Sequence, residues 1–268
     1  MARLRKHEKL LRPVHPNVGI EAAYRKKLLA LVDEMNASVE YFLKAAYRAN
    51  EPAIMAMDAT PAAGLQSAID DLTKRWKKRF DKGSKALAEY FARQAYSNGD
   101  RVMMKILKDA GMTVEFKMTS TMRDVMRATI EQNVGLIKSI PEQYLTQVQG
   151  AVMRSVQAGR DLGGLTKELE EQFGVTRRRA ALIARNQNNM ATASMTRVRQ
   201  VEVGIVEAVW LHSHGGREPR PTHLANTGKR YNVAEGWFDP DPRVRRRIWP
   251  GELINCRCVP KAVVKGFS

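Results

Sequence analysis

The sequence GIEAAYRKKLLALVDEMNASVEYFLKAAYRAN, residues 19–50, decides the fold class of this chain. Its apolar residues recur at steps of three, four and seven, so they fall on one face of an α-helix. A helix of this length with a single apolar face predicts a mainly α fold. The residues of the predicted stripe are Ala22, Leu29, Val32, Met35, Val39, Phe42 and Ala46.

Helical patterns continue beyond this stretch as far as residue 200. Two prolines and a glycine between residues 50 and 64 are expected to interrupt the first helix. The SNGD sequence at 97–100 is expected to end the second helix, and GMTVEFKMTS at 111–120 is predicted to be an extended link or a short strand. The helices predicted after the first cover 62–96, a shorter segment up to 110, 120–137, 141–158, 165–173 and 176–200.

Two aromatic residues within this helical region, Trp76 and Phe80, lie four positions apart in the basic sequence TKRWKKRFDK. At this spacing they share one face of a helix. Basic residues interleaved with aromatics are able to grip a nucleic-acid backbone. The favoured interpretation is an aromatic pair that faces the core, with solvated charges around it.

The character of the sequence changes after Gly204. IVEAVWLHSH at 205–214 is short, apolar and β-branched, which predicts a strand. A polar stretch rich in Gly, Pro and Arg follows over 215–250, and LINCRCVPKAVV at 253–264 predicts a last strand or pair of strands. The predicted fold is therefore mainly α, with a long helical N-terminal body and a small α+β C-terminal module.

Three regions follow from these patterns. Residues 1–17 are expected to form a basic flexible arm and residues 18–160 a helical body. Residues 161–268 form a C-terminal domain, with helices over 165–200 and the α+β module over 205–268.

Composition narrows the class of partner. Lys and Arg number 45 against 28 Asp and Glu, a net charge of +17, which attracts polyanions such as nucleic acid. No apolar run of 18 residues occurs, so no membrane span is expected, and the N-terminus lacks a secretory signal pattern. Two cysteines do not make a disulfide framework, which fits a reducing cytoplasm.

Two basic clusters are candidate contacts with DNA or an acidic protein. In the first, a glycine at 174 and Thr176 precede three arginines, which is a weak helix-turn-helix pattern and the basis of an alternative function as a DNA-binding protein. The second lies in DPDPRVRRRIWPG, where the Asp-Pro repeats favour an extended entry. The candidate contact residues are Arg177, Arg178, Arg179, Arg243, Arg245, Arg246 and Arg247.

The order of motifs over residues 160–265 resembles the phage Mu F-type head morphogenesis (minor head protein) family. An Arg-rich helix leads into the tryptophan-containing strand EAVWLHS, then RPTHLANTGKRY and finally PGELINCRC. The closing N-C-R-C is the most specific part, since it combines two rare residues at fixed spacing. The positions that match the family motif are Trp210, Arg220, His223, Gly228, Pro250, Asn255, Cys256, Arg257 and Cys258.

This resemblance implies a structural minor head protein of a tailed phage rather than an enzyme. It implies head assembly at or near the portal, a place in the virion head, and assembly in the host cytoplasm. The implied partners are the portal protein, the major capsid protein or both, and DNA without sequence specificity.

The two cysteines leave several alternatives open. Many family members carry a C-x-x-C pair that, with the final cysteines, looks like a zinc site, but this chain has no such pair. On strands, residues two apart share a face, so a zinc ligand set could come from His212, His214, His223, Cys256 and Cys258. Buried cysteines that pack in the core are the favoured interpretation, and no cofactor is assigned.

A disulfide and a catalytic thiol are the remaining alternatives. Two cysteines so close in a strand lie near the limit of disulfide geometry. A zinc-dependent or thiol enzyme would need a Cys and His pair, with Glu218 or Asp239 to orient the imidazole. Because Cys256 lies in an apolar context, where a thiol is normally inert, we expect no enzymatic activity.

Overall fold

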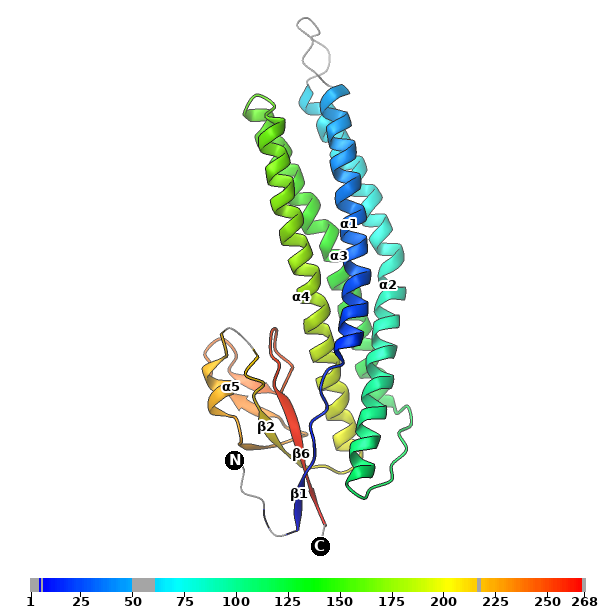
Figure 1. The fold of residues 1–268 in the computed structure, drawn as a ribbon, viewed down its shortest axis with the longest axis vertical. Helices are drawn as coiled ribbons and strands as arrows, with labels where there is room; N and C mark the ends of the chain where they lie inside the picture. The colour runs from blue at the N-terminus through cyan, green and yellow to red at the C-terminus, as the bar shows by residue number, and fades with distance from the viewer. Residues whose placement is uncertain (1–4, 6, 50–60, 216–217, 267–268) are drawn as a thin grey trace, which may run out of the picture. The chain divides into compact units, whose positions relative to one another are not determined.

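The computed structural model describes residues 5, 7–49, 61–215 and 218–266 (Figure 1). Long helices dominate, and strands are confined to both ends of the chain, which confirms the predicted mainly α fold with a small α+β module. The helices are α1 (Val18–Ala49), α2 (Pro61–Asp109), α3 (Ser120–Gln157), α4 (Leu162–Glu202) and α5 (Pro221–Ala225). The strands are β1 (Glu8–Leu10), β2 (Glu207–Leu211), β3 (Arg230–Asn232), β4 (Trp237–Asp239), β5 (Arg246–Ile248) and β6 (Val259–Lys265).

The chain divides into two compact units, and neither unit is a continuous segment of the sequence. One, here called the helical unit, comprises residues 22–88 and 131–184. The other, the mixed unit, comprises the described residues of 1–21, 89–130 and 185–268. The predicted linear division into arm, body and C-terminal domain does not coincide with these units, because all four long helices contribute residues to both.

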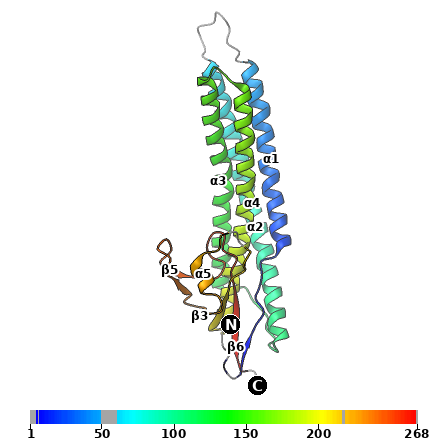
Figure 2. The same ribbon diagram turned by 60° about the vertical axis from the view of Figure 1, so that its left-hand side comes forward.

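The helical unit consists of four helical segments that run side by side, each opposite in direction to the one before (Figures 1 and 2). The buried residues of its first segment recur every three or four positions, so the helix faces its neighbours with one stripe. Val32, Met35 and Val39 belong to this stripe as predicted. Phe42 is 38% exposed, and the neighbouring Leu43 is buried instead. The observed stripe is Tyr24, Leu28, Val32, Met35, Asn36, Val39, Leu43 and Tyr47.

The aromatic pair on α2 faces the interior of the helical unit, as the favoured interpretation predicted. Phe80 is fully buried and Trp76 nearly so, with their ring centroids 6.4 Å apart in an edge-to-face arrangement. Such pairs add to the hydrophobic gain of burial. The indole N–H of Trp76 donates to Ser38 Oγ at 3.1 Å.

The helices are longer than predicted, because three expected interruptions lie inside them. SNGD at 97–100 is within α2, the predicted break between 137 and 141 is within α3, and the glycine at 174 is within α4. A glycine inside a helix costs about 0.5–1 kcal/mol and a proline about 3 kcal/mol. Burial of neighbouring side chains offsets these costs. Around Pro141 the buried neighbours are Ile137, Ile140 and Tyr144.

The continuity of α4 overturns the helix-turn-helix alternative. No turn separates the residues before position 174 from the basic residues after it. Thr176 does not cap a new helix, since its hydroxyl donates to the Gln172 carbonyl of the same helix at 2.8 Å. The helix begins instead behind Asp161, whose Oδ1 accepts the Gly164 amide hydrogen at 2.9 Å.

The mixed unit is built on a four-stranded antiparallel sheet in the order β1-β6-β2-β3. The β1 strand aligns Glu8 with Lys265 and Leu10 with Val263. Residues 8–10 therefore belong to the sheet, and the prediction of a flexible arm over 1–17 is wrong for them. Residues 1–4 and 6 of that predicted arm lie outside the described residues, as do residues 50–60 of the interruption predicted over 50–64. The last four positions of that interruption are helical, because α2 begins at Pro61.

Short elements fill the stretch predicted to be a polar connection over 215–250. They are α5, β3 and the antiparallel pair of β4 and β5. The predicted link after α2 is irregular rather than a strand. The strand predicted over 205–214 is confirmed as β2, although it ends at Leu211. The last strand, β6, begins at Val259, so both cysteines precede it.

A buried arginine connects three segments of the mixed unit. Arg199 of α4 is 2% exposed, and its guanidinium lies 2.7 Å and 2.8 Å from the Asp100 carboxylate. It also donates to Glu202 and to the Lys117 carbonyl, and it stacks over Phe116 at 4.5 Å. A buried charge is tolerated only when paired and hydrogen-bonded in this way. Asp100 belongs to the SNGD sequence, which therefore serves tertiary contact rather than helix termination.

None of the helices in the described part of the chain is both long enough and apolar enough to cross a membrane.

Candidate functional site

The residues that match the family motif all lie in the mixed unit. Trp210 lies on β2, is fully buried, and contacts the His223 ring edge-to-face at a centroid distance of 5.0 Å. His223 lies on α5, whose first residue is Pro221. The proline sets the backbone angle that starts a helix, and two residues later His223 faces the interior, where it is 2% exposed.

Backbone geometry in this region explains two of the glycines. Gly228, a motif position, has a φ of 81°, and its amide donates to the Trp210 carbonyl at 2.8 Å. Gly251, next to Pro250, has a φ of 84°, and a side chain there would place its Cβ 2.9 Å from Ala193 Cβ. Both positions require a residue without a side chain.

The loop before β6 carries both cysteines and turns them towards His223. Asn255 adopts a φ of 61°, a left-handed conformation that asparagine tolerates better than most residues. The Cys256 amide donates to the Leu253 carbonyl at 2.9 Å, which closes the turn. Cys256 and Cys258 are each 3% exposed and are free thiols, so the predicted burial is confirmed.

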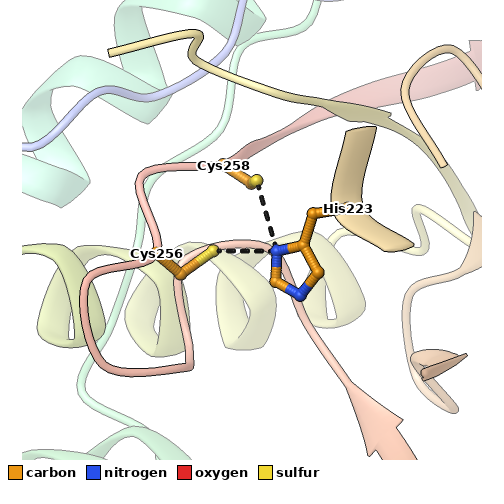
Figure 3. Close-up of side chains that lie close together, drawn as sticks. All are labelled: His223, Cys256 and Cys258. Carbon is orange, nitrogen blue, oxygen red and sulfur yellow. Dashed lines mark hydrogen bonds between the residues drawn. The ribbon is translucent and has the colours of Figure 1, made fainter. Parts of the chain in front are cut away.

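Both sulfur atoms face the same nitrogen of His223, as Figure 3 shows. Nδ1 of His223 lies 3.5 Å from Cys256 Sγ and 3.6 Å from Cys258 Sγ. The ligand atoms of these three buried residues all lie within 4.8 Å of one another. Although the cysteines are not on a strand, the loop gives them the common direction that a strand was expected to provide.

The other nitrogen of His223 is held by a buried carboxylate. Nε2 lies 3.2 Å from Asp239 Oδ2, and Asp239 is fully buried at the end of β4. The second oxygen of Asp239 accepts the Asp241 amide hydrogen at 3.0 Å. We assign the imidazole proton to Nε2, because a carboxylate accepts a hydrogen bond from it. Asp239 is therefore the residue that orients His223, whereas Glu218, the other candidate, is exposed.

The two histidines after β2 differ in environment. His212 is 8% exposed, and its Nδ1 lies 3.4 Å from Cys258 Sγ. His214 has a φ of 53° and is exposed, with its ring 4.8 Å from the His212 ring. The expectation that both face one ion is wrong for His214, because β2 ends before it. Burial is the main cause that lowers the pKa of His212, and the nearby His214 is the second. A lowered pKa favours the neutral form of the imidazole.

The two thiols have opposite pKa shifts. Hydrogen bonding with Cys258, helped by His223, lowers the pKa of Cys256. Hydrogen bonding with Cys256 and burial raise the pKa of Cys258. A second negative charge beside the first is unfavourable in a buried site. Ionisation of one of the two thiols therefore disfavours ionisation of the other.

Polar residues of α4 hold in place the loop before β6, residues 253–258, here called the cysteine loop. Asn189 Nδ2 donates to the Cys256 carbonyl at 3.2 Å, and Asn186 Oδ1 accepts the Asn255 amide hydrogen at 3.0 Å. Amide side chains can satisfy loop backbone that has no strand partner. Sequence analysis missed these two residues, although the run of amides at 186–189 on an otherwise amphipathic helix is a visible signal.

The remaining motif positions also hold this region together. Arg220 donates to the Ile254 carbonyl at 3.0 Å, and Arg257 donates to the Gly215 carbonyl. Pro250 is buried beside Gly251. The motif therefore describes a set of contacts around the cysteine loop.

Most of the seven arginines chosen as candidate DNA contacts are engaged within the protein. Arg177 pairs with Asp33, Arg179 donates to Ser139 at 2.8 Å, and Arg243 forms a two-point ion pair with Asp241. Arg246 pairs with Glu252 and Arg247 with Glu235. Arg178 and Arg245 are exposed, and the structure records no ion pair for either among the described residues.

A row of lysines lies on α2, in and just after the TKRWKKRFDK sequence whose charges the favoured interpretation treated as solvated. Between residues 72 and 88 there are seven Lys and Arg residues but a single acidic one, and all seven are exposed. Lys74, Lys78, Lys82 and Lys85 are three or four residues apart, so they follow one face of the helix over about 16 Å. The periodicity of the basic residues is the signal that could have found this row.

Comparison of the sequence with known proteins finds one matching family. Residues 146–260 match the model of the family described as Phage Mu protein F like protein. The matched region is similar to this family over 115 of the 268 residues of the chain. The match confirms the resemblance inferred from the N-C-R-C signature. The matched region begins within α3 and ends at the start of β6.

A relative from Haemophilus influenzae, described as an uncharacterized protein, is 28% identical over 256 residues. The alignment covers 92% of this chain and 54% of that protein, so this chain spans about half the length of the relative. No solved structure matches the chain.

Proposed function

We propose that this chain is a structural minor head protein of a tailed phage that acts in head assembly at or near the portal. The Mu F-like match over residues 146–260 is the observation that carries the proposal. Its partners are the portal protein, the major capsid protein or both, and it resides in the virion after assembly in the host cytoplasm.

A structural role rather than an enzymatic one is supported by the surroundings of the thiols. His223, Cys256 and Cys258 are all at least 97% buried. The cavity beside Cys258 has a volume of about 10 Å³, which is less than a small substrate needs. A Cys-His-Asp arrangement is present, but all of its residues are buried.

The apolar face of α1 is not free to bind a partner protein. An apolar stripe on a long helix can serve as a docking face for a partner subunit, and α1 carries such a stripe. This stripe is buried within the helical unit instead. Charge is therefore the stronger basis for contact with a partner.

DNA contact without sequence specificity is the second part of the proposal. The net charge of +17 favours it, and the lysine row on α2 is the part of the surface that suits it best. Its four ammonium groups lie on one helix face, which suits the regular spacing of backbone phosphates. The arginines near β5 suit it less, since carboxylates already neutralise most of them.

Analysis of purified heads tests the assembly role. Mass spectrometry of heads from the encoding phage is expected to find this chain at lower copy number than the major capsid protein. Cross-linking is expected to join it to the portal or the capsid. Heads that form normally without the gene, and that never contain the chain, would contradict the proposal.

Binding to two unrelated DNA duplexes at several salt concentrations tests the DNA contact. Both duplexes are expected to bind equally and to dissociate as salt rises. Neutralising Lys74, Lys78, Lys82 and Lys85 to glutamine should reduce the slope of log affinity against log salt by about three to four. The matched control neutralises the four arginines Arg243, Arg245, Arg246 and Arg247, for which a smaller reduction is expected. One strongly preferred duplex sequence, or a larger effect of the control, would contradict this part.

A further inference from the structure

We propose that the mixed unit binds one Zn²⁺ ion in a closed tetrahedral site. The ligands are His223 Nδ1, Cys256 Sγ, Cys258 Sγ and His212 Nδ1. They come from α5, from the loop before β6 and from the residue that follows β2. The ion would therefore tie together three segments that are distant in sequence.

Distances between the ligand atoms are those of a tetrahedron around zinc. With Zn–N near 2.0 Å and Zn–S near 2.3 Å, neighbouring nitrogen and sulfur ligands are about 3.6 Å apart. The two separations from His223 Nδ1 are 3.5 Å and 3.6 Å. The separation between His212 Nδ1 and Cys258 Sγ is 3.4 Å. Three nitrogen–sulfur edges of the tetrahedron are therefore already formed.

Hydrogen bonding alone accounts poorly for the same arrangement. With its proton on Nε2, His223 has one lone pair at Nδ1, directed in the plane of the ring. Two thiols lie at nearly equal distance from it, as both dashed lines in Figure 3 show. One lone pair makes one good hydrogen bond. A cation bound to Nδ1 and to both sulfurs satisfies all three atoms at once.

His212 supplies the fourth ligand. It is 92% buried, and the structure records no hydrogen-bond partner for its other ring nitrogen, Nε2. Nδ1 faces Cys258 Sγ, but the set of atoms mutually within 4.8 Å contains only the other three residues among those described. Full coordination therefore needs a small shift of the His212 ring towards His223.

Residues around the ligands complete the features of a structural zinc site. Asp239 accepts the Nε2 hydrogen of His223, an arrangement that fixes the tautomer and orientation of a ligating imidazole. Asn189 holds the carbonyl of Cys256, and Trp210 packs on the His223 ring. Four protein ligands and no open position distinguish structural from catalytic zinc sites.

Native mass spectrometry and elemental analysis of the full chain test the site. Protein produced with zinc in the medium is expected to carry one zinc ion, which a strong chelator removes. Cys256→Ser is expected to lose it. The matched control is His214→Ala, which removes an exposed histidine two residues from His212 and should leave the zinc content unchanged. Asp239→Asn should weaken zinc affinity by about 10- to 100-fold.

Cobalt substitution of the wild-type chain tests the ligand set without relying on variants that must fold. Co²⁺ in the site is expected to show tetrahedral d–d absorption and a thiolate-to-cobalt charge-transfer band, and Zn²⁺ should displace it. His212→Ala should change the d–d spectrum, whereas His214→Ala should not. Wild-type protein that binds neither zinc nor cobalt would overturn the proposal. Zinc content in Cys256→Ser equal to that of wild type would overturn it as well.

Discussion

The helical unit and the mixed unit of this chain achieve burial in different ways. In the helical unit, stripes of apolar residues on four long helices pack against one another, with Tyr24, Leu28 and Phe80 fully buried. In the mixed unit, strands of three to seven residues enclose buried polar and charged groups, among them Arg199, His223 and Asp239. Polar groups in such a core must each have a partner, so the mixed unit is more sensitive to the loss of a single side chain.

The largest difference in stability between the two units is expected when an ion pair is broken in each. Arg199→Ala leaves Asp100 and Glu202 without their shared cation in a nearly closed environment. Removal of one partner of a buried pair costs about 3–5 kcal/mol of unfolding free energy. Urea denaturation monitored by circular dichroism measures the change. Arg79→Ala in the helical unit is the control, because its pair with Glu34 is more than half exposed. A loss of about 0–1 kcal/mol is expected there, and equal losses in the two variants would contradict the comparison.

A substitution that weakens the hold on the cysteine loop is expected to have an intermediate effect on the free energy of unfolding. Asn189→Ala removes the donor to the Cys256 carbonyl and leaves a buried acceptor unsatisfied. The expected cost is about 1–3 kcal/mol of unfolding free energy. Ser194→Ala on the same helix is the control, since its hydroxyl bonds only to carbonyls of α4 itself. We expect denaturation experiments to separate the two variants, and a larger loss for Ser194→Ala would show that α4 does not support the loop in this way.

The smallest effect is a pH dependence at β1. Arg230 contacts the Glu8 carboxylate through both of its terminal nitrogens, and the Arg5 amide donates to the same carboxylate. These contacts lower the pKa of Glu8 from 4.5 to about 2. Because the folded pKa is the lower one, the stabilisation is complete above about pH 4.5 and is lost as the pH falls towards 2.

Thermal unfolding of wild type and Glu8→Gln between pH 6 and pH 2 measures this effect. The advantage of wild type is expected to shrink on acidification within that window. In an Arg230→Gln background, the main cause of the lowered pKa is gone, so the advantage should depend less on pH. A wild-type advantage that grows below pH 4.5 would contradict the assigned direction.

Much of the helical unit could be predicted from the sequence. Periodicity located the helices, and the spacing of Trp76 and Phe80 identified a core pair correctly. The residues that form the buried face of α1 were harder to predict, since Phe42 and Leu43 are adjacent and equally apolar. The sequence predicted too many interruptions of the helices. The local cost of a residue such as Pro141 is offset by the burial of neighbouring side chains, and only the packed structure shows which side chains are buried.

Prediction of the site was less complete. The N-C-R-C signature identified the cysteines, and the RPTHLANTGKRY segment identified His223. Asn189 and Asp100 act instead through contacts with residues far away in sequence. His212 and His214 have the same residue type and nearly the same position, yet one is buried and the other exposed. Where β2 ends decides this difference, and pairing with β6 at Val259 sets that end.

By itself, the sequence determined the helical character of the chain, its strong positive charge and the resemblance of its C-terminal region to a known family. These properties depend on composition, on local periodicity and on a short motif, all of which are present in the linear chain. Tertiary structure alone decided that residues 8–10 join the sheet and that two sulfurs meet one imidazole. Both depend on contacts between segments more than 30 residues apart, for which no local pattern in a single sequence provides the information.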